Sequence, residues 1–224
     1  MNLQEAFDFL NFWINKATSA WFTVSELELL LDRGQMAFYS DIKPKYATSQ
    51  LIKDILSPFK DTYNFTTAVS GYVIVPANKN YLDLLDIQIY YQISNRTVYY
   101  GVPIVNEDIR AVRLNSQIDP VTVTSPIGEQ TASGAFRLYP TGAYNGTITF
   151  LRRPVKPVFG YTTISQRVIV YDPNTSVQLE WRDTEIDSIL IKSLSSIGIN
   201  LTSQDLQQWS EVKSNNNYQR VNMI

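Results

Sequence analysis

The hydrophobic pattern of this 224-residue chain changes period along its length, and this limits the folds open to it. Near the N-terminus, Leu3, Phe7 and Leu10 recur at the three- and four-residue spacing of an amphipathic helix. From about Thr66 the spacing shortens to the alternation of strands, and a helical pattern returns near Asp183. Helices at both ends of a strand-rich middle predict an α+β fold.

These patterns divide the chain into four parts. Residues 1–65 are predicted to be helical, and residues 66–151 to form a β-domain with a long polar loop at 117–134. Loops of that length are uncommon unless they function, so we interpret this one as a projecting loop or a loose hairpin that serves as a contact arm. Residues 152–213 are predicted to form strands and a helix that pack back on the N-terminal helices. The polar segment 214–224 has no packing pattern and is interpreted as a tail that docks on a neighbour.

Local signals mark several helix positions. Asn2 with Glu5, and Thr23 with Glu26, have the spacing of capping boxes, so a helix is predicted after each. Gly34 falls inside the second of these helices, where glycine costs on the order of 1 kcal/mol relative to alanine. We therefore expect close packing or a kink at this position.

The second half of the chain carries three further expectations. Strands are predicted at 135–139 and 146–151, joined by a hairpin turn, and again at 167–171 and 176–180. The helix that begins near Asp183 has an apolar stripe, which we expect to lie against the sheet formed by the strands just before it.

The chain contains no cysteine and no histidine. Disulfides, thiol catalysis, thiolate metal sites and a histidine general base are therefore excluded. We find no phosphate-binding loop or nucleophile elbow, so no cofactor, no metal ion and no catalytic residue is predicted. Asp183, Glu185 and Asp187 are interpreted as acidic residues at a helix N-terminus, where the helix dipole favours them.

The overall charge and hydropathy limit the kinds of partner that the chain is expected to bind. The net charge is −2, which gives no general basic field for nucleic acid. No apolar run is long enough to predict a membrane span. The N-terminus lacks a basic region and carries Glu5 and Asp8, so no signal peptide is expected.

The composition of the chain favours contacts with other proteins. Aromatic residues make up 12% of the chain, including 14 tyrosines, and tyrosine and tryptophan are enriched at interfaces. Basic residues around a proline-rich corner can contact phosphates or a partner's acidic patch, although a solvated strand end is the simpler interpretation. The residues that we expect to contact subunits or partners are Trp13, Trp21, Arg152, Arg153, Lys156, Trp209 and Tyr218.

Several stretches together suggest a family. They are FTVSELELLLDRGQMAFYSD, LIKDILSPF, YVIVPANKNYLDLLDIQI, RRPVKPVFGY and YDPNTSVQLEWRDTEIDSILIKSLSSIGINL. In this order they resemble head-to-tail connector, or neck ring, proteins of tailed bacteriophages of gut Bacteroidetes, including crAss-like phages. The resemblance covers most of the chain, and its strand–helix unit near the C-terminus is the most specific part.

The resemblance implies a helical bundle, formed by the N- and C-terminal helices, with an inserted antiparallel β-rich domain. It also implies a non-enzymatic virion protein, made in the bacterial host cytoplasm and located at the head-to-tail junction. There it forms a ring, expected to be dodecameric, that contacts the portal and other neck or tail proteins. Double-stranded DNA passes through the ring without sequence-specific contacts.

Two other functions stay open from the sequence. A carbohydrate- or host-binding module of a phage tail or secreted system would show an exposed aromatic platform within residues 66–151. A hydrolase that uses carboxylates would show two buried Asp or Glu side chains in one cleft, with raised pKa values.

Overall fold

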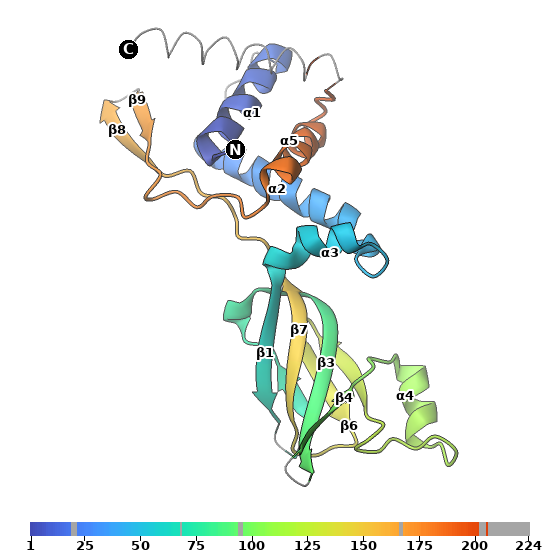
Figure 1. Ribbon diagram of the computed structural model, residues 1–224. Helices are drawn as coiled ribbons and strands as arrows, with labels where there is room; N and C mark the ends of the chain where they lie inside the picture. Colours follow the sequence, from blue (N-terminus) through green and yellow to red (C-terminus); the bar gives the residue numbers. More distant parts are fainter. Residues whose placement is uncertain (19–21, 68, 94–95, 166–167, 202–204, 206–224) are drawn as a thin grey trace. The chain divides into compact units, whose positions relative to one another are not determined.

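The computed structural model forms two compact units (Figure 1). It describes residues 1–18, 22–67, 69–93, 96–165, 168–201 and 205. Unit 1 comprises Met1–Ile55 and Pro154–Ile224, and unit 2, Leu56–Arg153, is inserted between these two segments. Helices combine with antiparallel sheets, so the predicted α+β fold is confirmed.

The boundaries of the inserted unit differ from those expected at 65/66 and 151/152. Residues 60–65, assigned to the helical part from sequence, belong to strand β1 (Lys60–Thr66) instead. The expected loop 117–134 also contains a strand, β5 (Ile127–Ala132). Both strands lack the regular apolar alternation on which the prediction depended, because their polar side chains outnumber their buried apolar ones.

Unit 1 is built from helices and one hairpin. Its helices are α1 (Leu3–Thr18), α2 (Val24–Ile42), α3 (Gln50–Leu56, which ends at the junction with unit 2) and α5 (Asp183–Ser196). A 3₁₀ turn at Lys43–Lys45 follows α2. The hairpin consists of β8 (Tyr161–Ser165) and β9 (Val168–Tyr171), which pair antiparallel.

The two predicted capping boxes are confirmed. The backbone N–H of Glu5 donates to Asn2 Oδ1 over 2.8 Å, and the Asn2 N–H donates to Glu5 Oε2 over 3.3 Å. Thr23 and Glu26 make the same reciprocal pair at the start of α2. Each box satisfies N–H groups that the first turn of a helix leaves without a partner.

Helix α5 was expected to lie against a sheet. It packs instead on helices α2 and α1. Its buried stripe contains Ile186, Ile189, Leu190 and Leu194. Gly34 of α2 faces this stripe, and a Cβ at Gly34 would lie 2.8 Å from the carbonyl oxygen of Ile189. Close packing, one of the two alternatives for Gly34, is therefore correct.

The chain between Pro154 and Trp181 is held against α2 by polar side chains. The fully buried Gln35 donates from Nε2 to the Val155 carbonyl over 3.1 Å and accepts from Trp181 Nε1 over 3.2 Å. The Phe159 N–H donates to Glu28 Oε1 over 2.8 Å. Residues 176–180, all of them described, do not form the expected strand, and the pairing found there is an isolated bridge between Val177 and Val158. Side chains of α2 supply hydrogen bonds that a sheet would otherwise provide.

Unit 2 contains two antiparallel sheets. The four-stranded sheet has the order β1-β7-β3-β4, and the three-stranded sheet has the order β2-β6-β5. The strands of these sheets whose bounds have not yet been given are β2 (Tyr72–Ile74), β3 (Tyr81–Ile93), β4 (Arg96–Gly101), β6 (Ala135–Tyr139) and β7 (Asn145–Arg152). Helix α4 (Glu107–Leu114) and 3₁₀ turns at Ser57–Phe59 and Ala77–Lys79 complete the unit.

The expected hairpin between β6 and β7 is wrong, because these strands belong to different sheets. The segment between them crosses from one sheet to the other. Tyr144 in this segment is buried, and its hydroxyl donates to the Pro140 carbonyl. Apolar side chains from both sheets form one core, which includes Val73, Ile87, Ile89, Phe136, Leu138, Ile148 and Phe150.

Candidate assembly interface

Helix α4 follows β4, an edge strand of the four-stranded sheet, and begins with a polar cap. The side chain of Asn106 accepts a hydrogen bond from the Ile109 N–H over 2.9 Å. Glu107 and Asp108 lie in the first turn, where negative charge interacts favourably with the helix dipole. These polar signals fix the start of the helix.

The arginines of α4 turn toward the unit. Arg110 forms an ion pair with Glu129 of β5, and this contact raises the pKa of the Arg110 guanidinium above its usual value. Arg113 pairs with Asp119 at 2.9 Å and donates to Ser125 Oγ over 3.1 Å. Polar contacts therefore hold the inner side of this helix.

The aliphatic residues of α4 and of the chain just after it face solvent. Val112 is 70% exposed and Ile118 is 98% exposed, and no residue of α4 is buried. We call the following residues the α4 surface: Ile109, Val112, Leu114 and Ile118. This orientation inverts the usual arrangement of a surface helix, in which the apolar side faces the core.

A second apolar surface lies at β2, an edge strand of the three-stranded sheet. Val69 is 77% exposed, Tyr72 is 46% exposed and Ile74 is 66% exposed, and we call these three residues the β2 surface. The guanidinium carbon of Arg137 lies 5.1 Å from the ring centroid of Tyr72 and 5.1 Å from that of Tyr139. Exposed apolar side chains of this size next to a charged residue are a feature of interaction sites.

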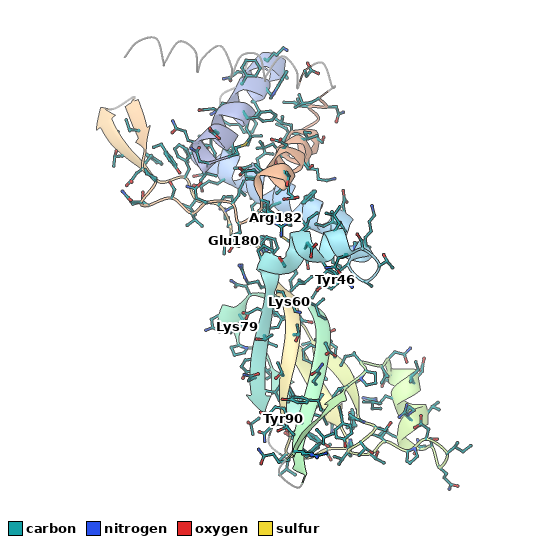
Figure 2. All side chains as sticks on the ribbon, viewed as in Figure 1. Tyr46, Lys60, Lys79, Tyr90, Glu180 and Arg182 are labelled. Carbon is teal, nitrogen blue, oxygen red and sulfur yellow. The ribbon has the colours of Figure 1, made fainter. Side chains whose placement is uncertain are left out.

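The outer side of the four-stranded sheet is mainly polar and has one aromatic pair. Tyr90 and Tyr99 lie directly opposite each other on β3 and β4, with ring centroids 5.7 Å apart, and Tyr99 is 61% exposed. Asn145 pairs with Tyr90 across the sheet and accepts a hydrogen bond from Thr66 over 2.8 Å. Figure 2 labels Tyr90 at the end of the sheet. Tyr99 is thus the exposed member of this aromatic pair, and Tyr90 is half-buried.

In unit 1, the β8–β9 hairpin extends away from the helices (Figure 1). Within the described residues, β8 and β9 pair only with each other, so each presents an open strand edge. Tyr171 anchors the base, because its ring centroid lies 5.0 Å from that of Phe159 and its hydroxyl accepts from Gln178. Open edges of this kind can accept a strand from another chain.

The structure places Trp13 in the core of unit 1. Its side chain is 2% exposed, its ring centroid lies 5.0 Å from that of Phe12, and Lys16 Nζ lies 4.5 Å above the ring. Phe9, Leu10 and Ile14 of the same helix are buried as well, so α1 is a core helix of this unit. Trp13 thus belongs to the interior of this unit and not to its surface.

The expected basic contacts do not form one group within a unit. Arg152 and Arg153 belong to unit 2, whereas Lys156 belongs to unit 1. Arg152 donates to the Pro58 carbonyl over 3.3 Å and lies over the Phe59 ring. Trp21, Trp209 and Tyr218, the other predicted contacts, lie outside the described residues.

Sequence reasoning missed the α4 and β2 surfaces. The signal was present in EDIRAVRL, where Arg110 and Arg113 are three residues apart and share one side of a helix. Val112 falls on the other side. Either side can face the protein, and nothing in the segment alone decides which one does.

The described residues contain no group of three or more acidic residues that could hold a metal ion. A groove of about 440 Å³ lies where the chain leaves β4, and its lining includes Asp86 as the single titratable residue. Burial raises the pKa of Tyr81, and separately that of Tyr91, to about 12, which keeps both phenols protonated.

None of the helices in the described part of the chain is both long and apolar enough to span a bilayer. No family model matches the sequence, and no curated protein matches it either.

Proposed function

We propose that this protein is a structural subunit of an oligomeric ring in the head-to-tail connector of a tailed phage. In this role it joins the portal to the tail and surrounds the DNA channel. It acts by assembly and not by catalysis. The observation that carries the proposal is the inverted helix α4, whose arginines are bound inward while its aliphatic residues face solvent.

Aliphatic surface that stays in water costs free energy. Burial of apolar surface contributes roughly 25 cal/mol per Å², so the α4 surface gains free energy only when another molecule covers it. The β2 surface and the open edges of the β8–β9 hairpin offer further contacts. Interfaces of obligate assemblies bury about 2,000 Å² or more, so a subunit with several contact surfaces suits such an assembly.

The charge of the chain agrees with a channel wall. A net charge of −2 provides no strong attraction to the phosphate backbone, so DNA can pass without being held. The dodecameric ring, the portal contact and the location in the virion come from the family resemblance and belong to the same proposal.

Mass measurement tests this proposal. Light scattering of the purified chain, alone and mixed with the portal protein of the same genome, is expected to show a closed multimer or a stable complex with the portal. Val112→Asp is expected to reduce that mass, because it places a charge in the α4 surface. Leu51→Asp is the matched control, since Leu51 is 67% exposed and lies outside both surfaces. A wild-type chain that stays monomeric with and without the portal would refute the proposal.

A second candidate is a carbohydrate- or host-binding module, which the Tyr90–Tyr99 pair favours. Sugar rings stack on exposed aromatic faces, and the neighbouring Asn145 could hydrogen-bond their hydroxyl groups. This function predicts glycan binding that Tyr99→Ala abolishes and Val112→Asp leaves unchanged. The ring function predicts the reverse pattern for assembly.

A further inference from the structure

The three-stranded sheet of unit 2 has one side in the core and one side facing outward. Phe136 and Leu138 of β6 point into the core, so Arg137 and Tyr139 point to the outer side. By the same alternation Val73 points inward, which places Tyr72 and Ile74 on the outer side of β2. The strand order β2-β6-β5 therefore defines two opposite ends of this outer side.

Helix α4 occupies the β5 end of the outer side. Arg110 bonds Glu129 of β5, and the Tyr139 hydroxyl lies within 3.4 Å of the same carboxylate. Tyr139 is 8% exposed, whereas Ile74 at the other end is 66% exposed. Helix α4 thus contacts the outer side at Glu129 of β5, and the β2 half is open.

The two surfaces carry complementary charge. Asp108 lies one helical turn before Val112 on α4, is exposed, and has no ion pair with the described residues. Arg137 lies beside Tyr72 in the β2–β6 register, is half-buried, and has no ion pair with the described residues. Glu129, its neighbour across the sheet, is already bound to Arg110. Arg137 therefore has unused capacity for an acidic partner.

We infer that the α4 surface of one copy packs on the β2 surface of the next copy, with Asp108 facing Arg137. This inference rests on the proposed ring function and names the contact that would build the ring. Each α4 is then enclosed between its own sheet and the sheet of its neighbour. The aliphatic residues of both surfaces become buried, and the open half of the outer side becomes covered.

The geometry of this contact has a consequence for symmetry. The two surfaces are different and lie at opposite ends of one sheet, so each copy can bind one neighbour through each surface. Such a head-to-tail contact repeats from copy to copy and produces a ring when the rotation closes. A two-fold contact between identical α4 surfaces would instead stop at a dimer and would place Asp108 near its own copy.

The absence of native cysteine makes this contact directly testable. Chains with Val112→Cys and chains with Ile74→Cys are mixed and treated with a short bifunctional thiol cross-linker. Both positions are exposed, so the substitutions should leave the fold intact. Cross-linked heterodimers are expected in the mixture, with little product from either chain alone. Val112→Cys mixed with Leu51→Cys serves as the matched control.

The outcomes separate this inference from the proposed function when the mass of each mixture is measured as well. Multimers without the heterodimer product would overturn the inference and leave the ring function standing. Efficient cross-linking of Val112→Cys with itself would overturn it in favour of a two-fold contact. Monomers in every mixture would refute both.

Discussion

Replacing Gly34 with alanine tests the contact between α2 and α5 more sharply than any large substitution. In an isolated helix this change stabilises the helical state by about 1 kcal/mol, because glycine forms helices less readily than alanine. In the folded chain, the new Cβ would lie 1.9 Å from Ser193 Oγ and 2.8 Å from the Ile189 carbonyl oxygen. Both values are below normal contact distances, so the two effects have opposite signs.

The free-energy cost of fitting the new Cβ between the helices should exceed the gain in helix propensity. Ser193 is fully buried, and its hydroxyl donates to the Ile189 carbonyl over 2.9 Å, so it has little room to move. Overpacking costs about 1–3 kcal/mol, and a disturbed buried hydrogen bond about 1 kcal/mol. After subtraction of the gain in helix propensity, Gly34→Ala is expected to lower the free energy of unfolding by about 1–3 kcal/mol.

Urea unfolding followed by tryptophan fluorescence measures this change. All four tryptophans belong to the segments of unit 1, so their emission reports that unit. Ser40→Ala, at an exposed position of α2, is the control and should change stability by a few tenths of a kcal/mol at most. Adding Ser193→Gly should recover part of the loss, because it removes the nearest atoms. A Gly34→Ala chain more stable than wild type would refute the close approach.

Three further predictions concern other parts of the chain. Trp13→Ala should destabilise unit 1 by about 3–5 kcal/mol in the same urea assay, and a loss below about 1 kcal/mol would contradict a core position. The pKa of Tyr81 and that of Tyr91 are raised to about 12 in the folded state, so the stability of unit 2 should fall as the pH rises from about 10 to 12. Tyr81→Phe should make that fall shallower in alkaline denaturation monitored by circular dichroism; an unchanged slope would argue against the buried phenol. Arg110→Ala should loosen α4 and speed amide hydrogen exchange there, whereas unaltered exchange would show that the contact with Glu129 does not hold the helix.

The sequence predicted best what depends on neighbouring residues. The capping boxes at Asn2 and Thr23 form as expected, because each needs only two residues one turn apart. The α+β class also followed from the change in hydrophobic period. The meaning of Gly34 was open between two alternatives, since close approach depends on Ser193, which is distant in sequence.

The predictions that were wrong concern features that depend on residues distant in sequence. Strand β1 is stabilised by its antiparallel pairing with β7, and a segment as polar as KDTYNFT gives no local sign of that pairing. The turn after β6 resembled a hairpin, but the strand that follows it joins the other sheet. The stripe of α5 fitted either a sheet or a helix equally well. The outward orientation of α4 is set by Glu129, which lies 19 residues after Arg110.

The most direct test of the assembly account is electron microscopy of the purified chain beside its Val112→Asp variant. Ring assembly through the α4 surface predicts closed rings of one symmetry with a central opening for the wild type, and single subunits for the variant, while Leu51→Asp still forms rings. Wild-type particles that remain single subunits at every concentration, or rings that Val112→Asp leaves intact, would contradict it.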